Sequence, residues 1–123
     1  MEGTEGVTGT GDHDDVRGTL IDFVANRVSP AQQAVVTKHL DAWYKTVWKA
    51  QWKSSAELKE QVSSASVLTS ERVVFNIKGN DYRLIAAINF RRQILFVKWL
   101  GTHKEYDKID AREVKYDEDR YLS

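Results

Sequence analysis

A chain of 123 residues, 41% apolar and 29% charged, has the size and composition of one soluble globular domain. It contains no cysteine, which excludes disulfide frameworks, thiolate metal sites and cysteine nucleophiles. The formal net charge is zero, but residues 16–109 carry fifteen Lys and Arg against eight Asp and Glu, an imbalance that favours a polyanion as partner.

The first 15 residues contain four glycines and five acidic residues and have almost nothing to bury. Such a segment cannot offset its ordering entropy, so we expect a mobile tail over residues 1–15. The next residues, 16–110, are expected to form the domain, and residues 111–123 a second acidic tail.

Helical periodicity begins near Thr19, where apolar residues start to recur on one helical face and predict a short first helix. Ser29, Pro30 and Gln32 then predict the capped start of a long amphipathic helix that ends near Ala50. The apolar and aromatic positions of that second helix are Val36, Leu40, Trp43, Tyr44, Val47 and Trp48. Ser54 and Glu57 repeat the capping pattern for a third helix through about Val62.

After a polar loop the apolar period changes from helical to alternating, which is typical of strands. We predict strands over residues 72–77, 82–90 and 94–100, joined by a turn at residues 78–81 and a short connection at residues 91–93. Gly101 is expected to end the last strand, with a loop or turn after it. The fold class is therefore α+β, with N-terminal helices packed on one face of a twisted antiparallel meander.

Alternation divides the strand residues between two faces of the predicted sheet. Apolar residues, with Val97 and Trp99 among them, are assigned to the face that meets the helices. The opposite face is expected to collect Arg72, Asn76, Arg83 and Lys98.

The sheet exit brings a second group of chemically active residues, His103, Lys104, Glu105 and Tyr106. Metal-independent RNA cleavage needs a base for the 2′-hydroxyl, cations for the phosphorane charge and an acid for the leaving 5′-oxygen. His103, Glu105 and Tyr106 can transfer protons, while Arg83 and Lys104 can hold the phosphate. The alternative is that Tyr106 packs, Glu105 pairs with a lysine and Arg83 is an ordinary strand residue.

Other sites are less specific in the sequence. His13, His39 and His103 are far apart and lack the spacing of metal ligands, so we expect neither a metal nor a cofactor. Arg91 and Arg92 at a hairpin tip could contact RNA or form a solvated loop. No run approaches the roughly 20 apolar residues of a membrane span and no signal peptide is visible, which predicts a cytoplasmic protein without a membrane partner.

The stretches RVVFNIKGNDYRLIAAINF and ILFVKWLGTHKEYDKID strongly resemble HigB-type toxins, which carry RVVFNI, GN.YRL and GTH.EYD in the same order. The preceding AWYKTVWKAQWKSSAELKEQ is similar to the helical segment of that family, so the resemblance spans about Trp43 to Asp110. It implies the RelE/ParE fold and an endoribonuclease that cleaves mRNA in the ribosomal A site. Its implied partners are a helix-turn-helix antitoxin of the HigA type, the ribosome and mRNA, with operator DNA reached only through the antitoxin complex.

By position in this resemblance, Arg83 matches the arginine used on the scissile phosphate, and Tyr106 the aromatic that orients the substrate nucleotide. His103 and Lys104 match a cationic or proton-donating group, and Glu105 shares the proton transfer with His103. The chain departs from the family by lacking a clear apolar strand before the first helix. Two other functions stay open, a gyrase-inhibiting toxin of the same fold and a non-catalytic module that binds RNA or protein.

Overall fold

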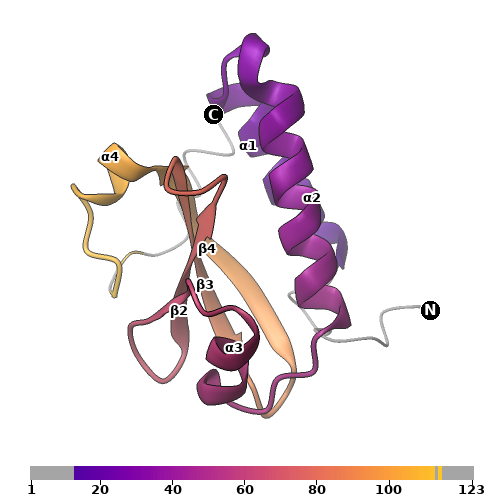
Figure 1. Ribbon diagram of the computed structural model, residues 1–123, viewed down its shortest axis with the longest axis vertical. Coiled ribbons are helices and arrows are strands. Elements are labelled where there is room, and N and C mark those ends of the chain that lie inside the picture. Colours follow the sequence, from indigo (N-terminus) through magenta and orange to yellow (C-terminus); the bar gives the residue numbers. More distant parts are fainter. Residues whose placement is uncertain (1–12, 113, 115–123) are drawn as a thin grey trace.

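The computed structural model describes residues 13–112 and residue 114. Its chain folds into a helical layer packed against one antiparallel sheet, with a short helix on the other side of the sheet (Figure 1). The α+β arrangement expected from the sequence is confirmed. Most of the two expected tails, residues 1–12, 113 and 115–123, lies outside the described residues.

Helix α1 spans His13–Arg27, so it begins earlier than the periodicity near Thr19 indicated. Val16 is buried in the core, which extends the apolar face of the helix by one turn toward its N-terminus. Residues 13–17 are therefore helical. They do not form the apolar strand that family members are expected to have before the first helix.

The long second helix is confirmed, but its start differs from the prediction. A single 3-10 turn, η1 (Pro30–Gln32), precedes α2 (Gln33–Lys49). The Ser29 side chain makes no cap hydrogen bond; its carbonyl oxygen instead accepts from the backbone N–H of Gln32 at 2.9 Å. In this 3-10 turn a backbone carbonyl accepts the hydrogen bond that the Ser29 side chain was expected to accept, so the expected capping box does not form.

The third helix, α3 (Ser55–Gln61), has the predicted cap. The Oγ of Ser54 accepts from the backbone N–H of Glu57 at 3.2 Å. The Glu57 carboxylate reaches one residue further back than expected and accepts from the N–H of Lys53 at 2.9 Å.

Four antiparallel strands follow in the order β1-β2-β3-β4. They are β1 (Ser66–Val67), which the sequence did not reveal, β2 (Arg72–Ile77), β3 (Tyr82–Asn89) and β4 (Ile94–Thr102). Lys78 and Gly79 adopt positive φ in the first hairpin and Gln93 in the second, as tight turns between twisted strands require. Gly101 was expected to end the last strand but is paired within it, opposite Arg83.

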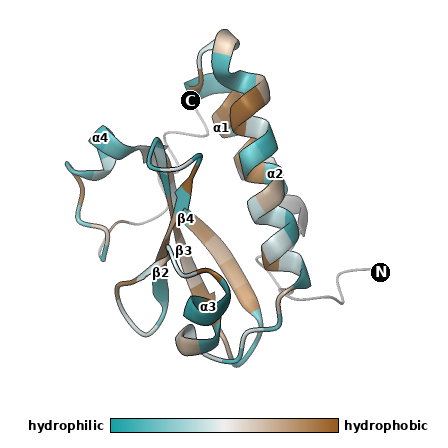
Figure 2. Cartoon of the chain, viewed as in Figure 1, coloured by the Kyte–Doolittle hydropathy of each residue, from teal (hydrophilic) through white to brown (hydrophobic). Residues whose placement is uncertain are grey.

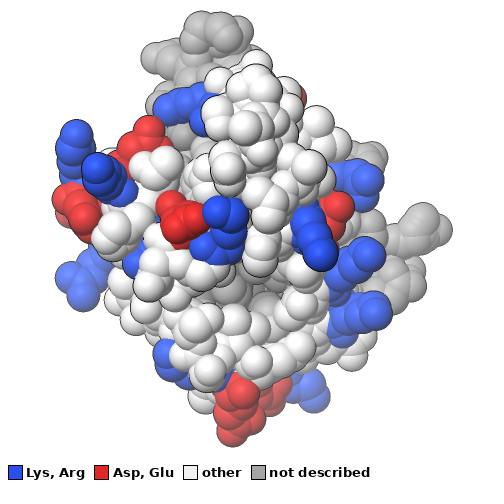
Figure 3. All heavy atoms as spheres, turned by 45° about the horizontal axis from the view of Figure 1, so that its top comes forward, with Lys and Arg blue, Asp and Glu red and all other residues white. Residues whose placement is uncertain are grey.

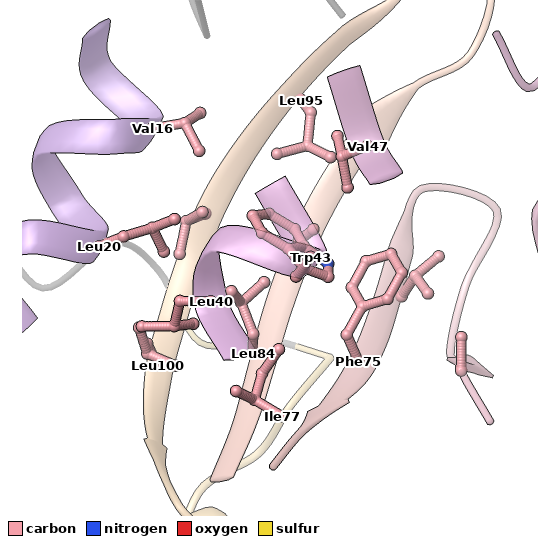
Figure 4. Close-up of a cluster of buried hydrophobic side chains, with 14 of the residues drawn as sticks. Val16, Leu20, Leu40, Trp43, Val47, Phe75, Ile77, Leu84, Leu95 and Leu100 are labelled. Carbon is pink, nitrogen blue, oxygen red and sulfur yellow. The ribbon is translucent and has the colours of Figure 1, made fainter. Parts of the chain in front are cut away.

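The main core lies between the helices and the inner face of the sheet. Figure 4 shows Trp43 and Leu40 of α2 directed at Phe75 of β2 and Leu84 of β3. The rings of Trp43 and Phe75 meet edge to face, with centroids 5.5 Å apart. Burial of this interlocking apolar surface is the main force that fixes the helices on the sheet.

The outer face of the sheet is not the polar surface that strict alternation predicted. Val74, Ile85 and Trp99 form a second buried cluster at its centre. The pairing of β3 with β4 is shifted between Ile85 and Ala86, so that Val97 lies opposite Ala86 and Trp99 opposite Ile85. This β-bulge turns Trp99 to the outer face, and the assignment of Trp99 to the helical core was therefore wrong.

The residues that follow β4 cover this outer cluster. Helix α4 (His103–Tyr106) is hydrophilic along most of its length in Figure 2, but Tyr106 packs on the cluster. Ile109, Ala111 and Val114 pack there as well.

Among the described residues, no helix is both long and apolar enough to cross a membrane.

Gly101 leaves the space that this arrangement requires. A Cβ at Gly101 would lie 2.5 Å from Cη2 of Trp99 and 2.6 Å from Oε1 of Glu105. We expect Gly101→Ala to lower the free energy of unfolding by about 1–3 kcal/mol, since the buried ring must move to admit the methyl group. Urea unfolding measures this change.

The matched control is Gly18→Ala in α1, where no atom lies within 4 Å of the added Cβ. There the same substitution should raise stability by about 0.5–1 kcal/mol, because alanine loses less backbone entropy in a helix. Equal effects at the two glycines would contradict the packing argument.

Candidate active site

The candidate site lies where β3 begins and β4 ends. Register places Asn76 of β2 opposite Arg83 of β3, and Arg83 opposite Gly101 of β4. Arg83 is half-buried, and its Nη1 donates to the carbonyl oxygen of Asn80 at 3.2 Å. Its guanidinium carbon lies 5.9 Å from the centre of the Tyr106 ring, within the range of a cation–π contact.

Helix α4 forms here because its four residues follow a capping box. The Oγ1 of Thr102 accepts from the N–H of Glu105 at 3.1 Å, and Oε1 of Glu105 accepts from the N–H of Thr102 at 2.9 Å. The N–H of His103 also donates to the carbonyl oxygen of Asp81 at 3.0 Å, which ties the helix to the turn before β3. These bonds hold His103 and Tyr106 at the same end of the sheet as Arg83.

Both carboxylate oxygens of Glu105 have partners within the chain. While Oε1 caps the helix, Oε2 lies 3.7 Å from Nη2 of Arg27 in α1. The carboxylate thus joins α4 to the helical layer. Its geometry suits a structural cap better than a base that must receive a proton from a substrate.

His103 and Lys104 are both exposed. The imidazole Nε2 of His103 lies 3.8 Å from Oδ2 of Asp107, one turn further along. An exposed imidazole is a candidate proton donor or acceptor for a substrate. Lys104 presents an exposed positive charge next to it.

Three other predicted residues are on the outer face but have intramolecular partners. Arg72 Nη1 donates to the carbonyl oxygen of Ala111 at 3.1 Å, and Asn76 Nδ2 donates to that of Ser64 at 3.3 Å. Lys98 Nζ lies 5.4 Å from the centre of the Phe96 ring. The apolar cluster and the segment that covers it separate Arg72 from Arg83, so the continuous cationic face predicted from alternation is interrupted.

Arg91 and Arg92 lie at the far end of the sheet. β3 runs eight residues from Tyr82 to Asn89, about 25 Å at the usual rise of a strand, and the two arginines follow it. They are exposed but cannot belong to the same small site as Arg83.

Charge is distributed around the molecule rather than gathered in one patch on the face that Figure 3 shows. There lysines and arginines are scattered over the face, several of them beside acidic side chains, and uncharged areas lie between them. Among residues 13–112 and 114, no group of three or more His, Asp or Glu side chains could hold a metal ion.

The arrangement can bind a phosphate and move a proton. A half-buried guanidinium beside an aromatic ring can hold and neutralise a phosphodiester while the ring contacts the adjoining base. An exposed imidazole from the adjacent helix can serve as acid or base. The guanidinium, the aromatic ring and the imidazole therefore lie at one end of the sheet.

The family model of the HigB toxin, the RelE-like toxic component of a toxin–antitoxin system, matches residues 36–109. This match covers more than half of the chain. The chain belongs to the HigB toxin family.

Curated members of the HigB family are similar over part of their length. The mRNA interferase toxin HigB of Escherichia coli K12 is 33% identical over 68 residues, which cover 54% of this chain and 65% of the relative. The mRNA interferase HigB of Shigella flexneri has the same identity and coverage. That of Escherichia coli O6:H1 is 47% identical over 36 residues, 29% of this chain and 35% of the relative. The chain thus matches a little under two thirds of the length of the first two relatives.

Two features of the candidate site were not predicted from the sequence in the form that the structure shows. The capping box of Thr102 and Glu105 could have been found, because a Thr followed three residues later by Glu is its signature. The outer-face position of Trp99 could not have been found, because a bulge breaks the alternation from which the face of a strand residue is predicted.

The capping geometry predicts how this HigB-family chain responds to changes at Glu105. Glu105→Ala removes the acceptor for the Thr102 N–H and should lower the free energy of unfolding by about 1 kcal/mol. Glu105→Gln keeps an acceptor oxygen and loses only a partly exposed ion pair with Arg27, so it should stay near parental stability. Urea unfolding of both variants tests this, and an equal loss in the two would argue against the cap.

Proposed function

We propose that the chain is a toxin that cleaves mRNA on the ribosome by metal-independent attack of a 2′-hydroxyl on the adjacent phosphate. The observation that carries this proposal is the placement of Arg83 over the Tyr106 ring, next to the exposed His103. Family membership supports it, and the relatives from Escherichia coli and Shigella flexneri are named mRNA interferases.

In this reaction Arg83 stabilises the negative charge that develops on the phosphorane. Tyr106 stacks on or orients a nucleotide next to the scissile bond, and Lys104 adds a second positive charge at the exposed side. Arg72, Asn76, Arg91, Arg92 and Lys98 are proposed to contact RNA away from the reacting phosphate.

Proton transfer is assigned to His103 before Glu105. Both oxygens of Glu105 have intramolecular partners. The imidazole of His103 is exposed, and its contact with Asp107, at 3.8 Å, is a long one between two exposed side chains. As the 2′-oxygen attacks phosphorus, its proton passes to a base, and the 5′-oxygen leaves with a proton from an acid. His103 can serve in one of these roles.

Arg83→Ala should lower the single-turnover rate of mRNA cleavage on programmed ribosomes about a hundredfold or more, because one preorganised charge at the phosphorane is lost. The matched control is Lys38→Ala, which removes one positive charge from an exposed position on α2. Parental cleavage by Arg83→Ala, with urea unfolding to show that it is folded, would contradict the site assignment.

The product ends test the mechanism itself. Attack by the 2′-hydroxyl leaves a 2′,3′-cyclic phosphate or 3′-phosphate upstream and a 5′-hydroxyl downstream, which end-labelling and mass spectrometry distinguish from other ends. A 3′-hydroxyl would refute the mechanism. If no RNA product formed and gyrase were inhibited instead, the chain would be the gyrase-directed toxin considered from the sequence.

The proposed partner is a helix-turn-helix antitoxin of the HigA type, bound in the cytoplasm, through which the complex reaches operator DNA. Binding is expected to block either the site or entry into the ribosomal A site. Cleavage should therefore fall to background when the antitoxin is added at equimolar concentration, measured with purified proteins on programmed ribosomes. A stable equimolar complex that cuts at the free rate would contradict this inhibition.

A further inference from the structure

Trp99 is a buried residue that the proposed mechanism does not yet use. It is only 7% exposed, yet it lies outside the main core that holds Trp43, Trp48 and Trp52. The bulge of β4 places it on the outer face of the sheet, next to Val74 and Ile85. A tryptophan is an unusually large side chain to bury in a cluster of three buried residues, which raises the question of what it supports.

The indole is held in one place by its neighbours. Its Cη2 and Cζ2 atoms would lie 2.5 and 2.7 Å from a Cβ at Gly101, so the six-membered ring rests against the glycine backbone. Gly101 is paired with Arg83 across the two strands. The ring of Trp99 therefore lies beside the strand position from which the Arg83 side chain departs.

Tyr106 joins Trp99 to Arg83. The rings of Trp99 and Tyr106 have centroids 6.1 Å apart and an interplanar angle of 57°, and the Arg83 guanidinium lies 5.9 Å from the Tyr106 centroid. None of the four residues of α4 is fully buried, and a single helical turn has little stability of its own. The capping box fixes the start of α4, while contact with Trp99 fixes the ring at its end.

We propose that Trp99 is a positioning residue of the active site, which sets the Tyr106 ring and through it the orientation of the Arg83 guanidinium. This inference rests on the proposed function. Trp99 does not touch the substrate; its effect on the reaction passes through the two residues that do. A smaller aliphatic side chain would leave Tyr106 without its support, and the guanidinium would lose its fixed orientation toward the phosphate.

The test compares Trp99→Leu and Trp99→Phe with the parent in ribosome-programmed cleavage. Because misplacement of a binding group by about 1 Å can cost about a hundredfold in rate, we expect Trp99→Leu to lower kcat about 10- to 100-fold. KM should change little, since the exposed cations proposed to contact RNA are unaltered. Trp99→Phe retains an aromatic ring and should restore most of kcat.

Trp52→Leu is the matched control. Trp52 is also buried, at 6% exposure, and its Nε1 donates to Oε1 of Gln61 at 2.9 Å, on α3 rather than α4. It should lose stability in urea as Trp99→Leu does, but should keep the parental kcat at a temperature where both are folded. An equal fall of kcat in the two variants would mean that Trp99 acts only through stability, and would overturn the proposal.

A second measurement does not depend on nuclease activity. The Nε–Hε resonance of Arg83 in a 1H–15N spectrum senses the ring current of Tyr106, so it should shift in Trp99→Leu and remain near the parental position in Trp99→Phe and Trp52→Leu. An unshifted resonance in Trp99→Leu would overturn the proposal. A parent that fails to cleave mRNA would overturn the proposed function instead, and the resonance would still decide whether Trp99 positions Arg83.

Discussion

The indole of Trp99 rests on the bare backbone of Gly101, where an added Cβ would come within 2.5 Å of the ring. The contact exists because β4 bulges at Lys98 and turns Trp99 away from the helices. It gives the outer face a buried centre on which Tyr106 and the residues after α4 can pack. The position of the candidate site thus follows from one irregularity in strand pairing and one missing side chain.

Burial on both faces of the sheet changes how its charged residues can act. The helices cover the inner face, and Tyr106, Ile109, Ala111 and Val114 cover the centre of the outer face. Arg72 donates to the carbonyl oxygen of Ala111, whereas Arg83 contacts the Tyr106 ring at the end of the sheet. Two arginines on the same face are therefore in different environments, one bonded to a covering residue and the other beside exposed His103 and Lys104.

The acidic residue of the site illustrates how a catalytic residue type can serve structure. Glu105 closes the capping box with Thr102 and reaches Arg27 on α1, so it connects the helical layer to α4. The same carboxylate, considered from the sequence, was one of two candidates for proton transfer. Its partners favour His103 for that role, and they explain why a single helical turn can hold a defined position at the sheet edge.

Elements with local signals could be predicted from the amino-acid sequence alone. The long amphipathic α2, the Ser54 cap of α3, the hairpin at Lys78 and Gly79 and the meander of β2 to β4 were all predicted, because periodicity and turn residues act over a few positions. The HigB motifs located Arg83, His103 and Tyr106, and the structure brings these to one end of the sheet; their catalytic roles stay a prediction. Three features depend on tertiary packing: the face that Trp99 occupies, the separation of Arg72 from Arg83 and the contacts of Glu105. A bulge and the packing of distant segments depend on contacts between residues far apart in the chain, and no short sequence pattern predicts those contacts.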